Sequence, residues 1–234
     1  MTSNDDVLHE ITAQVLLKAY SCGIFPMAEA ADDPALYWIE PQARGILPLN
    51  AVHVPRRLAR TVRQDVYEVR TDTSYDGVIE GCSKARAGRE STWINARIRA
   101  LYAELFAMGH CHTIECWHEG ALVGGLYGVA LGGAFFGESM FSEMRDASKV
   151  ALVHLAARLN FGGFVLLDCQ FQTHHLAQFG TVEIGRQEFQ DRLDRALLYL
   201  GDWHALGDTV SGARALEVIE RAHEDARPVT HSAS

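Results

Sequence analysis

The chain has 234 residues, of which 48% are hydrophobic, and a formal net charge of −9. This length is enough for one large core or two modest ones, and the negative charge argues against a protein that coats nucleic acid indiscriminately. The chain opens with acidic rather than basic residues and contains no apolar run near the roughly 20 residues of a membrane span, so we expect a cytoplasmic protein.

The first 62 residues contain short elements. A helix is expected over Val7–Cys22, ended by Gly23. After a loop, strand candidates follow at residues 36–39 and 46–49. Nearby prolines cannot donate to a strand ladder, which confines both candidates to sheet edges or strand ends. Residues 55–63 have the character of a basic helix.

The middle of the chain alternates between helical and strand patterns. Residues 66–70 alternate like a strand, and helices are expected over Tyr75–Ala87 and from Ile94 to Leu105. Turn residues then separate three strands, expected at 111–117, 121–130 and 134–137. We therefore predict an antiparallel meander in the second part of the chain.

A crossover helix and a buried strand follow the meander. The helix is expected over Asp146–Leu159 and the strand over residues 164–170, because Phe164–Leu167 is a continuous apolar run. After a polar loop, a last strand is expected at 182–184 and a last helix at 189–200. The tail from residue 227 is rich in Pro, Thr, Ser and Ala, so we expect it to be disordered.

The buried strand ends in polar residues without a turn. Side chains alternate along a strand, so Asp168 and Gln170 are expected to point the same way and Cys169 the other. Glu138 adds a second carboxylate at the end of a neighbouring apolar strand. Two acids and an amide are thus expected at one mouth of the sheet, which is more typical of a functional site than of a core.

Three other patterns do not carry a function. The glycines between 124 and 133 match no phosphate-binding fingerprint and lie inside strands, where a bulge or the close approach of a ligand backbone explains them better. The run Gly137–Phe141 resembles a nucleophile elbow, but Phe141 stands where the second glycine is required. Strand parity directs the Cys169 thiol away from Asp168, which disfavours a cysteine nucleophile assisted by His174 or His175.

Cysteine and histidine spacing predicts no metal. The five cysteines are scattered, which is typical of reduced thiols, and none forms a C-x-x-C pair. The run His110–His112, with Cys116 and His118, could be drawn as a metal site. Alternate residues of a surface strand give the same picture, so we expect neither a metal nor another cofactor.

The charge is uneven along the chain. Between Arg56 and Arg99 there are ten basic and six acidic residues, a local balance of +4. This segment could contact a phosphate backbone or form a solvated helical face, and charge alone leaves both open. Aromatic residues beside turns, among them Trp38, Trp93 and Phe135, could stack on a base or line a pocket, although each alone is more often a core residue.

Eight motifs, in register between about residues 7 and 195, resemble the bacterial leucyl/phenylalanyl-tRNA protein transferase family. They are Phe25-Pro26-Met27, Tyr37-Trp38 with Pro41, Thr92-Trp93-Ile94, Gly109-His110, Leu122–Val129, Phe136–Ser142, Ala147-Ser148-Lys149 and Leu167–Gln170. The resemblance implies an α+β fold, with a small N-terminal α/β domain (residues 1–62) packed on a GNAT-like domain (63–226) whose mixed sheet is flanked by helices.

The resemblance also implies an activity and its partners. It implies transfer of Leu, Phe or Met from aminoacyl-tRNA to proteins with N-terminal Arg or Lys, which marks them for N-degron proteolysis. It implies that the following residues surround the aminoacyl-adenosine end of the tRNA: Trp38, Trp93, Leu126, Phe135, Glu138 and Ser139. It places Asp168 and Gln170 at the reacting centre.

The chain departs from the family pattern at three places. Leu126 stands where some relatives carry Met, and the segments 173–175 and 178–180 stand where relatives often show an Asn-containing loop and Leu-Gly-Ala. These departures bear on the acceptor-side contacts and on the choice among Leu, Phe and Met. They leave Asp168 and Gln170 unchanged.

The chemistry implied by the resemblance suits these residue types. An aminoacyl ester is already activated, so the enzyme must orient an amine, accept its proton and stabilise an oxyanion. We predict that Asp168 polarises Gln170, which relays the proton, while Glu138 anchors the cationic acceptor or orients the aminoacyl group. Phosphate contacts are predicted for Arg56, Arg57, Arg60, Lys84 and Arg86, and the protein is expected to be a monomer.

Two other functions remain open. A CoA-dependent N-acyltransferase would share a GNAT-like core, but it would need backbone donors for a pyrophosphate where residues 142–146 offer acids. A non-catalytic binder of tRNA ends or basic N-termini would not require both an acid–amide pair and an apolar pocket.

Overall fold

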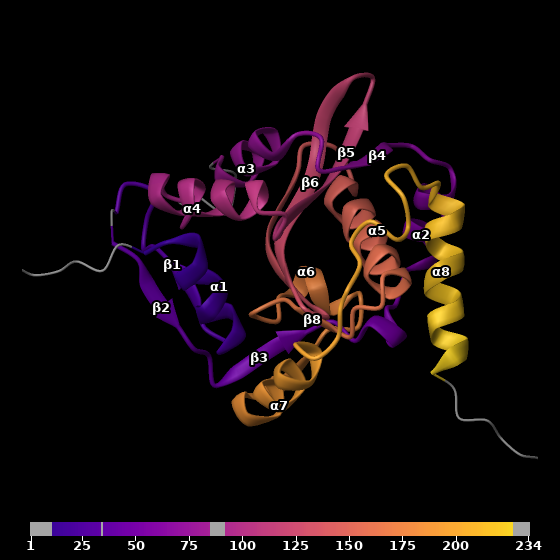
Figure 1. The fold of residues 1–234 in the computed structure, drawn as a ribbon. Coiled ribbons are helices and arrows are strands. Elements are labelled where there is room, and N and C mark those ends of the chain that lie inside the picture. The colour runs from indigo at the N-terminus through magenta and orange to yellow at the C-terminus, as the bar shows by residue number, and fades with distance from the viewer. Residues whose placement is uncertain (1–10, 34, 85–91, 227–234) are drawn as a thin grey trace, which may run out of the picture.

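The computed structural model describes residues 11–33, 35–84 and 92–226. Helices and strands are mixed along this part of the chain, and most of the strands join one sheet of seven. In Figure 1 the long strands arch through the centre, with helices on both sides. The predicted α+β class is confirmed.

The seven-stranded sheet has the order β4-β5-β6-β7-β8-β3-β9. Every neighbouring pair is antiparallel except β7 and β8, which are parallel and joined by the crossover helix α5. The strand bounds are β4 Glu68–Thr71, β5 Cys111–His118, β6 Ala121–Leu131, β7 Ala134–Ser142, β8 Leu166–Asp168, β3 Ala43–Ile46 and β9 Val182–Gly185.

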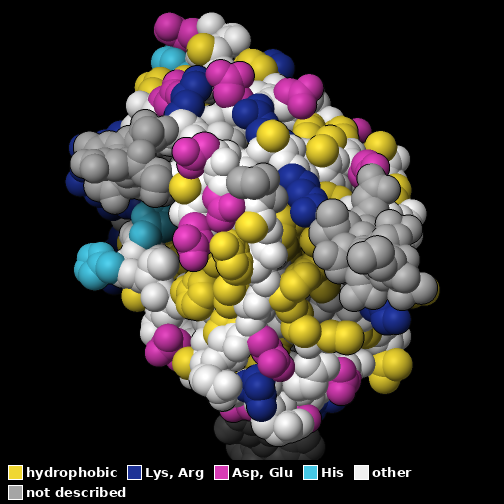
Figure 2. Space-filling model, turned by 90° about the vertical axis from the view of Figure 1, so that its left-hand side faces the viewer, with side chains coloured by type: hydrophobic (Ala, Val, Ile, Leu, Met, Phe, Trp, Pro, Cys, Tyr) yellow, Lys and Arg dark blue, Asp and Glu magenta, His cyan; other side chains and the backbone are white. Residues whose placement is uncertain are grey.

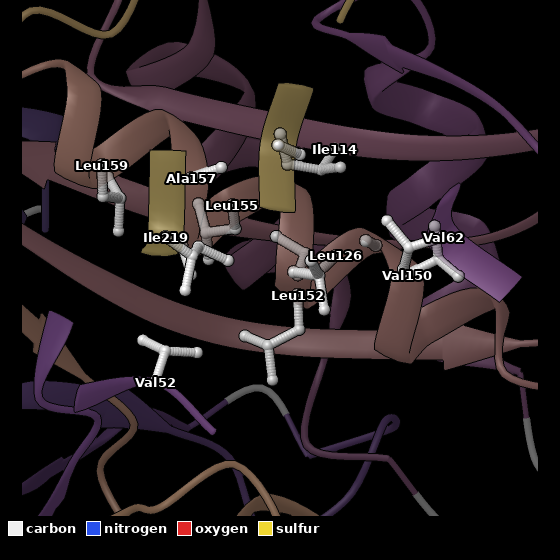
Figure 3. Close-up of a cluster of buried hydrophobic side chains, with 14 of the residues drawn as sticks. Val52, Val62, Ile114, Leu126, Val150, Leu152, Leu155, Ala157, Leu159 and Ile219 are labelled. Carbon is white, nitrogen blue, oxygen red and sulfur yellow. The ribbon is translucent and has the colours of Figure 1, made fainter. Parts of the chain in front are cut away.

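One face of the sheet is covered by α5 (Ala147–Phe161), against which α2 (Arg56–Arg63) and α8 (Gly212–Asp225) pack. Twelve of the 15 residues of α5 are buried, as expected of a helix that lies between a sheet and other helices. Figure 3 shows the resulting core, in which Ile114 and Leu126 of the sheet, Leu152 and Leu155 of α5, and Ile219 of α8 belong to one buried cluster.

The other face is covered by α1 (Ala13–Ser21), α3 (Tyr75–Ser83) and α4 (Ala96–Ala107). Beside α1 lies a separate two-stranded sheet of β1 (Phe25–Met27) and β2 (Tyr37–Ile39). Figure 2 views the molecule from this side and shows hydrophobic side chains gathered across the middle of the face. The exposed large hydrophobic residues of α1 and β2 are Val15, Tyr37 and Trp38.

Three short elements complete the fold around β8 and β9. The helix α6 (His174–Ala177) follows β8, α7 (Arg186–Ala196) follows β9, and the 3-10 helix η1 (Leu49–Ala51) follows β3. α6 and α7 lie next to β8.

Glycines allow two close approaches to β6. A Cβ atom on Gly124 would lie 2.5 Å from the Cβ of Ala147, at the start of α5. A Cβ on Gly128 would lie 2.4 Å from the ring of Phe135, at the register shift between β6 and β7. The predicted bulge is therefore confirmed at Gly128, whereas Gly124 allows the close approach of α5.

Several predicted elements differ from the structure. The strand predicted at 46–49 lies at 43–46, and it is not an edge strand, because it pairs with both β8 and β9. Pro48 does not conflict with this, since it falls after the strand. β7 extends beyond residue 137 to Ser142, and α8 was not predicted at all. The predicted disordered tail lies outside the described residues.

The strand predicted at 164–170 is also shorter than expected. β8 contains only Leu166–Asp168, and the side chain of Val165 is 49% exposed. The chain is still leaving α5 at Phe164, whose N–H bonds to the carbonyl of Leu159. At the other end, Gln170 adopts a positive φ of 55°, which ends the extended backbone.

Candidate active site

A cavity of about 650 Å³ opens where β7 and β8 part. β7 pairs with β8 only from Ala134 to Phe136, and the remainder of β7 continues beyond the end of β8. The apolar wall comes from β6, β7, α5 and β8 and includes Leu126, Met140, Leu152, Leu155 and Leu167. Strands and a helix hold these apolar side chains in place, and residues that follow β8 complete the wall.

The polar side of this cavity centres on Glu138 of β7. Its Oε1 accepts hydrogen bonds from the Tyr20 hydroxyl, at 2.7 Å, and from Nε2 of Gln170, at 3.4 Å. Its Oε2 accepts from the Tyr102 hydroxyl, at 2.9 Å, and the two tyrosine hydroxyls also contact each other. Side chains from two different helices, Tyr20 of α1 and Tyr102 of α4, thus bind the same carboxylate.

This environment changes the acidity of Glu138. Burial of the carboxylate raises its pKa to about 7, and the nearby charge of Asp168 acts in the same direction. The hydrogen bonds from Tyr20 and Tyr102, together with the charge of Arg44, oppose the rise only in part. Burial raises the pKa of both tyrosines well above the usual value, so their hydroxyls remain donors. Glu138 can therefore exchange a proton near neutral pH.

Asp168 does not line the cavity. Its side chain is fully buried, and its oxygens accept from the Arg44 guanidinium of β3, with Nε–Oδ1 at 2.9 Å and Nη2–Oδ2 at 2.6 Å. Oδ1 also accepts from the backbone N–H of Gln170, at 2.9 Å. The contact between Asp168 and Gln170 is therefore to the main chain of Gln170 and not to its amide side chain.

The predicted alternation of Asp168, Cys169 and Gln170 is wrong, because Cys169 and Gln170 both line the cavity and Asp168 does not. Alternation applies only to extended backbone, and Gln170, with its positive φ, lies two residues beyond the end of β8. The Gln170 side chain nevertheless lies on the cavity wall, next to Glu138. The turn, and not strand alternation, brings it there.

The five other predicted substrate contacts lie in different surroundings. Trp93, Leu126 and Ser139 line the cavity together with Glu138. Phe135 is fully buried and stacks on Trp203, with ring centroids 5.5 Å apart, so it lies in the core behind the sheet. Trp38 is 40% exposed on β2 and is not among the residues that line the cavity.

A smaller cavity adjoins the polar side of the first. It measures about 70 Å³ and is lined by Phe25, Met27, Trp93, Glu138, Gln170 and Phe171. Trp93, Glu138, Gln170 and Phe171 are shared with the larger cavity. Two compartments of different size therefore meet at the Glu138–Gln170 pair.

A third, more polar cavity of about 540 Å³ lies beside α6 and is lined by Lys149, His174, His175, Ala177 and Gln178. It shares His175 with the large cavity. Nζ of Lys149 lies 2.9 Å from Oδ1 of Asp146, which partly neutralises its charge. Burial, and then the charge of Lys149, lowers the pKa of His175, which favours the neutral imidazole.

Cys169 also borders the large cavity. Burial, together with the adjacent Asp168, raises the pKa of its thiol far above the usual value. The position of Cys169 on the cavity wall contradicts the strand alternation that predicted the opposite direction for its thiol. The protonated thiol is nevertheless a poor nucleophile. Among the described residues, no group of three or more His, Cys, Asp or Glu side chains is arranged to hold a metal ion.

The basic residues proposed for phosphate contact have different surroundings. Arg56, Arg57 and Arg60 are exposed on α2, and within the described part of the chain they form no ion pair. Lys84 lies 3.4 Å from Glu80 and 3.9 Å from Glu143. Arg86 lies outside the described residues. No described helix combines the length and apolar character that a membrane crossing requires.

Arg44, Tyr20 and Tyr102 were not predicted as site residues. Each reaches the site from an element far away in the chain: 124 residues separate Arg44 from Asp168, and 118 separate Tyr20 from Glu138. Both tyrosines fall on the buried faces of helices, where the sequence pattern indicates only core residues. No local pattern marks Arg44 either, since it lies in a four-residue strand.

Two protein-family models match the chain. The model described as leucyl/phenylalanyl-tRNA protein transferase matches residues 46–194, and that of the N-terminal domain of the same family matches residues 9–42. Curated relatives carry the name leucyl/phenylalanyl-tRNA–protein transferase. A protein of Rhodopseudomonas palustris (strain HaA2) is 57% identical over 221 residues, which cover 94% of this chain and 99% of the relative.

Relatives from other genera are similar to the same extent. A protein of Afipia carboxidovorans is 58% identical over 221 residues, covering 94% of this chain and 97% of the relative. One of Caulobacter vibrioides (strain NA1000 / CB15N) is 55% identical over 211 residues, covering 90% and 97%. The matched regions include the meander, the crossover helix and the end of β8, and so contain the whole cavity.

Proposed function

This chain belongs to the leucyl/phenylalanyl-tRNA protein transferase family, as its motifs indicated, and we propose that the cavity at Glu138 is where it acts. Membership makes the chain an aminoacyltransferase that uses aminoacyl-tRNA. In our proposal it transfers Leu, and also Phe or Met, to the N-terminal Arg or Lys of acceptor proteins. The observation that carries this is a carboxylate of pKa about 7 at the polar edge of a large apolar cavity.

The large cavity suits the aminoacyl donor. Its volume of about 650 Å³ lies within the range of small-molecule sites, and most of its wall is apolar. An uncharged Leu, Phe or Met side chain would bury apolar surface against Leu126, Met140 and Leu155, whereas a charged side chain would lose its hydration there. Trp93, at the junction of the two compartments, offers a ring on which the terminal adenine could stack.

The reaction needs one proton acceptor and one polar orienting group. The acceptor's α-amino nitrogen attacks the ester carbonyl carbon, the C–N bond forms, and the bond to the ribose oxygen breaks. Glu138 accepts the proton that the amine loses, and the proton then passes to the departing ribose oxygen. The amide of Gln170, 3.4 Å from Glu138, holds the amine or the developing oxyanion in place.

A pKa near 7 fits this role for Glu138. A carboxylate at its ordinary pKa would be a weak base toward an amine, while one that titrates near neutral pH is better matched to the proton. Asp168 contributes indirectly in this proposal, because its carboxylate contacts the Gln170 main chain and does not line the cavity. This revises the relay in which Asp168 polarises the Gln170 amide.

The small cavity suits the basic acceptor. The rings of Phe25, Trp93 and Phe171 surround it, and Glu138 supplies a negative charge when ionised. A guanidinium or ammonium group is attracted both to aromatic faces and to a carboxylate. These features support a preference for N-terminal Arg or Lys over neutral N-termini.

The exposed arginines of α2 support a role in tRNA binding. Arg56, Arg57 and Arg60 have no ion-pair partner among the described residues, so their charges are free to meet phosphates. α2 packs against α5, the helix that supplies Leu152 and Leu155 to the cavity wall. We include Lys84 and Arg86 in this proposal on the basis of the sequence alone. We further propose a monomer that acts in the cytoplasm and marks its acceptors for N-degron proteolysis.

One assay tests the function. Leu-tRNA labelled in the leucine is incubated with the full chain and a peptide that begins with Arg, with a peptide of the same sequence that begins with Gly as the control. We expect label on the Arg peptide only, abolished when the tRNA is first digested with RNase. Transfer from acetyl-CoA in place of the tRNA, or no transfer to either peptide, would contradict the proposal.

A further inference from the structure

Arg44 is enclosed on every side by groups that bind a guanidinium. Only 1% of the residue is exposed. Two of its nitrogens bind the Asp168 carboxylate, and Nη1 donates to the carbonyl oxygen of Gly23, at 2.8 Å. The guanidinium carbon lies 4.7 Å from the ring centre of Phe25 and 4.3 Å from that of Phe189. A planar, bidentate cation between two rings is a geometry that lysine cannot reproduce.

The pair occupies most of the hydrogen-bonding capacity of the Asp168 carboxylate. Its oxygens accept three N–H groups, two from Arg44 and one from the main chain of Gln170. The carboxylate is also absent from the walls of the large and small cavities. Because it is fully buried, paired with a cation and outside both cavity walls, Asp168 is badly placed to act as an acid or a base.

Both main-chain polar groups of Gln170 are hydrogen-bonded, one to Asp168 of β8 and the other to Gly45 of β3. The N–H of Gln170 donates to Asp168, and its carbonyl accepts from the N–H of Gly45, at 3.0 Å. A Cβ on Gly45 would lie 2.7 Å from the main chain of Phe171 and Gln172, so this approach requires glycine. These bonds hold Gln170 at a positive φ, which non-glycine residues avoid unless their surroundings impose it.

We propose that Arg44 is a positioning residue for the transfer reaction: through Asp168 it fixes the backbone of Gln170 and so sets the Gln170 amide against Glu138. The inference rests on the proposed function. It assigns Asp168 to the same positioning unit and leaves Glu138 as the proton acceptor. Without the bidentate pair, the Gln170 backbone can relax toward negative φ, which moves its amide away from the reacting amine.

The test compares Arg44→Lys, Arg44→Met and Asp168→Asn with wild type in the leucyl transfer assay. The matched control is Arg158→Lys, because Arg158 is also buried, donates to two backbone carbonyls and lies over the Trp203 ring, away from both cavities. Arg44→Lys retains the charge and serves if Arg44→Met does not fold. Circular dichroism and thermal unfolding establish which variants are folded.

We expect Arg44→Lys to lower kcat by about 10- to 100-fold, the scale of a misplacement of roughly 1 Å, with KM for tRNA and peptide within about threefold of wild type. Arg158→Lys should leave kcat within about threefold. In folded Arg44→Met the acid limb of the pH–rate profile should move to higher pH, since the Arg44 charge normally lowers the pKa of Glu138. Asp168→Asn should retain the component of the acid limb that is lost in Glu138→Gln, because Glu138 still titrates.

Three results would overturn the inference. They are an unchanged kcat in Arg44→Lys, an equal loss in Arg44→Lys and Arg158→Lys, and an acid limb in Asp168→Asn that is reduced to the titration of the acceptor amine, which would make Asp168 the base. Failure of the proposed function itself is distinguishable, because wild type would then transfer no leucine.

Discussion

At the scale of single residues, Glu138 shows how strongly surroundings alter a side chain. It lies near the middle of β7, and its carboxylate is buried between two tyrosine hydroxyls and the Gln170 amide. Each hydroxyl stabilises the charged form, but burial outweighs both, so the net result is a pKa of about 7. The same residue on an open strand would be ionised throughout the physiological range.

This pKa predicts the pH dependence of transfer. Glu138 must be ionised to accept a proton, so its contribution to kcat/KM should be lost as pH falls through about 7. Glu138→Gln should lower the rate by about 10² to 10⁴ and remove this component of the acid limb, leaving only the titration of the acceptor amine. Transfer rates measured between pH 5.5 and 8.5 check this, with the exposed Glu183→Gln as the control. Identical profiles in the two variants would remove Glu138 as the base.

The raised pKa also predicts a pH-dependent stability difference. The folded state binds the Glu138 proton more tightly than the unfolded state, so this group favours folding most below pH about 4.5, and the contribution is lost as pH rises through about 7. Glu138→Gln does not titrate. Its free energy of unfolding should therefore rise relative to wild type by up to about 3 kcal/mol between pH 4.5 and 8. Urea unfolding at several pH values measures the difference, and a constant difference would contradict the expectation.

At the scale of elements, the site depends on how β6, β7 and β8 are joined. The parallel pairing of β7 with β8 covers three residues, after which the strands part and the cavity begins. Before that point Gly128 of β6 allows Phe135 of β7 to pack directly against it, at the register shift between the two strands. β7 and β8 thus part just after a point at which β6 and β7 are packed too tightly for another methyl group at Gly128.

This packing predicts the cost of adding that methyl group. Gly128→Ala would place a Cβ 2.4 Å from the Phe135 ring and from the carbonyl oxygen of Phe136, so it should lower the free energy of unfolding by about 1 to 3 kcal/mol. Gly137→Ala in β7 is the control, since its Cβ would meet only the Asp168 carbonyl oxygen, at an ordinary 3.5 Å. Chemical denaturation of both variants measures the difference. Equal stability would show that β6 and β7 can separate freely at this point.

The basic helix α2 predicts how tRNA binding responds to salt. If Arg56, Arg57 and Arg60 contact phosphates, replacing each by Gln should reduce the slope of log K against log salt by about 0.7 to 0.9. Arg221→Gln on α8 is the control, because Arg221 is exposed but already paired with Glu217. Filter binding of Leu-tRNA from 50 to 300 mM salt gives the slopes. A slope that is unchanged in the triple variant would exclude α2 from the tRNA interface.

At the scale of the whole molecule, the N-terminal part of the chain is not peripheral to the site. β3 lies between β8 and β9 in the main sheet, and from it Arg44 reaches Asp168. α1 supplies Tyr20, and β1 supplies Phe25 and Met27 to the small cavity. Figure 1 shows α1 and β1 on the opposite side of the sheet from α8. The N-terminal elements and the main sheet therefore both contribute residues to the site.

This arrangement predicts the behaviour of a fragment. The division of the chain at residue 62 stays a prediction, but a fragment of residues 63–226 would leave β8 without its β3 neighbour and Asp168 without its cation. A buried carboxylate that has lost its partner is strongly destabilising. We expect this fragment to lack a cooperative thermal transition, measured by circular dichroism, while residues 11–226 retain one. A cooperatively folding fragment would support an autonomous second domain.

The sequence by itself determined much of this protein, because much of it is encoded locally. Turn residues and periodicity identified the meander and the crossover helix, and the motifs identified the family. They also selected Glu138 and Gln170, which the structure brings to one cavity. Such features depend on neighbours within a few residues, whose preferences can be read along the chain.

The tertiary structure alone decided the partners of these residues. The Arg44–Asp168 pair, the two tyrosines on Glu138 and the central position of β3 join segments that are distant in sequence. The positive φ of Gln170 is imposed by these contacts and not by its own preference. Phe135 and Trp38 were assigned to the aminoacyl site, but one is buried against Trp203 and the other is exposed on β2. Periodicity tells which face of an element is buried, whereas only the packed chain determines which side chain lies opposite.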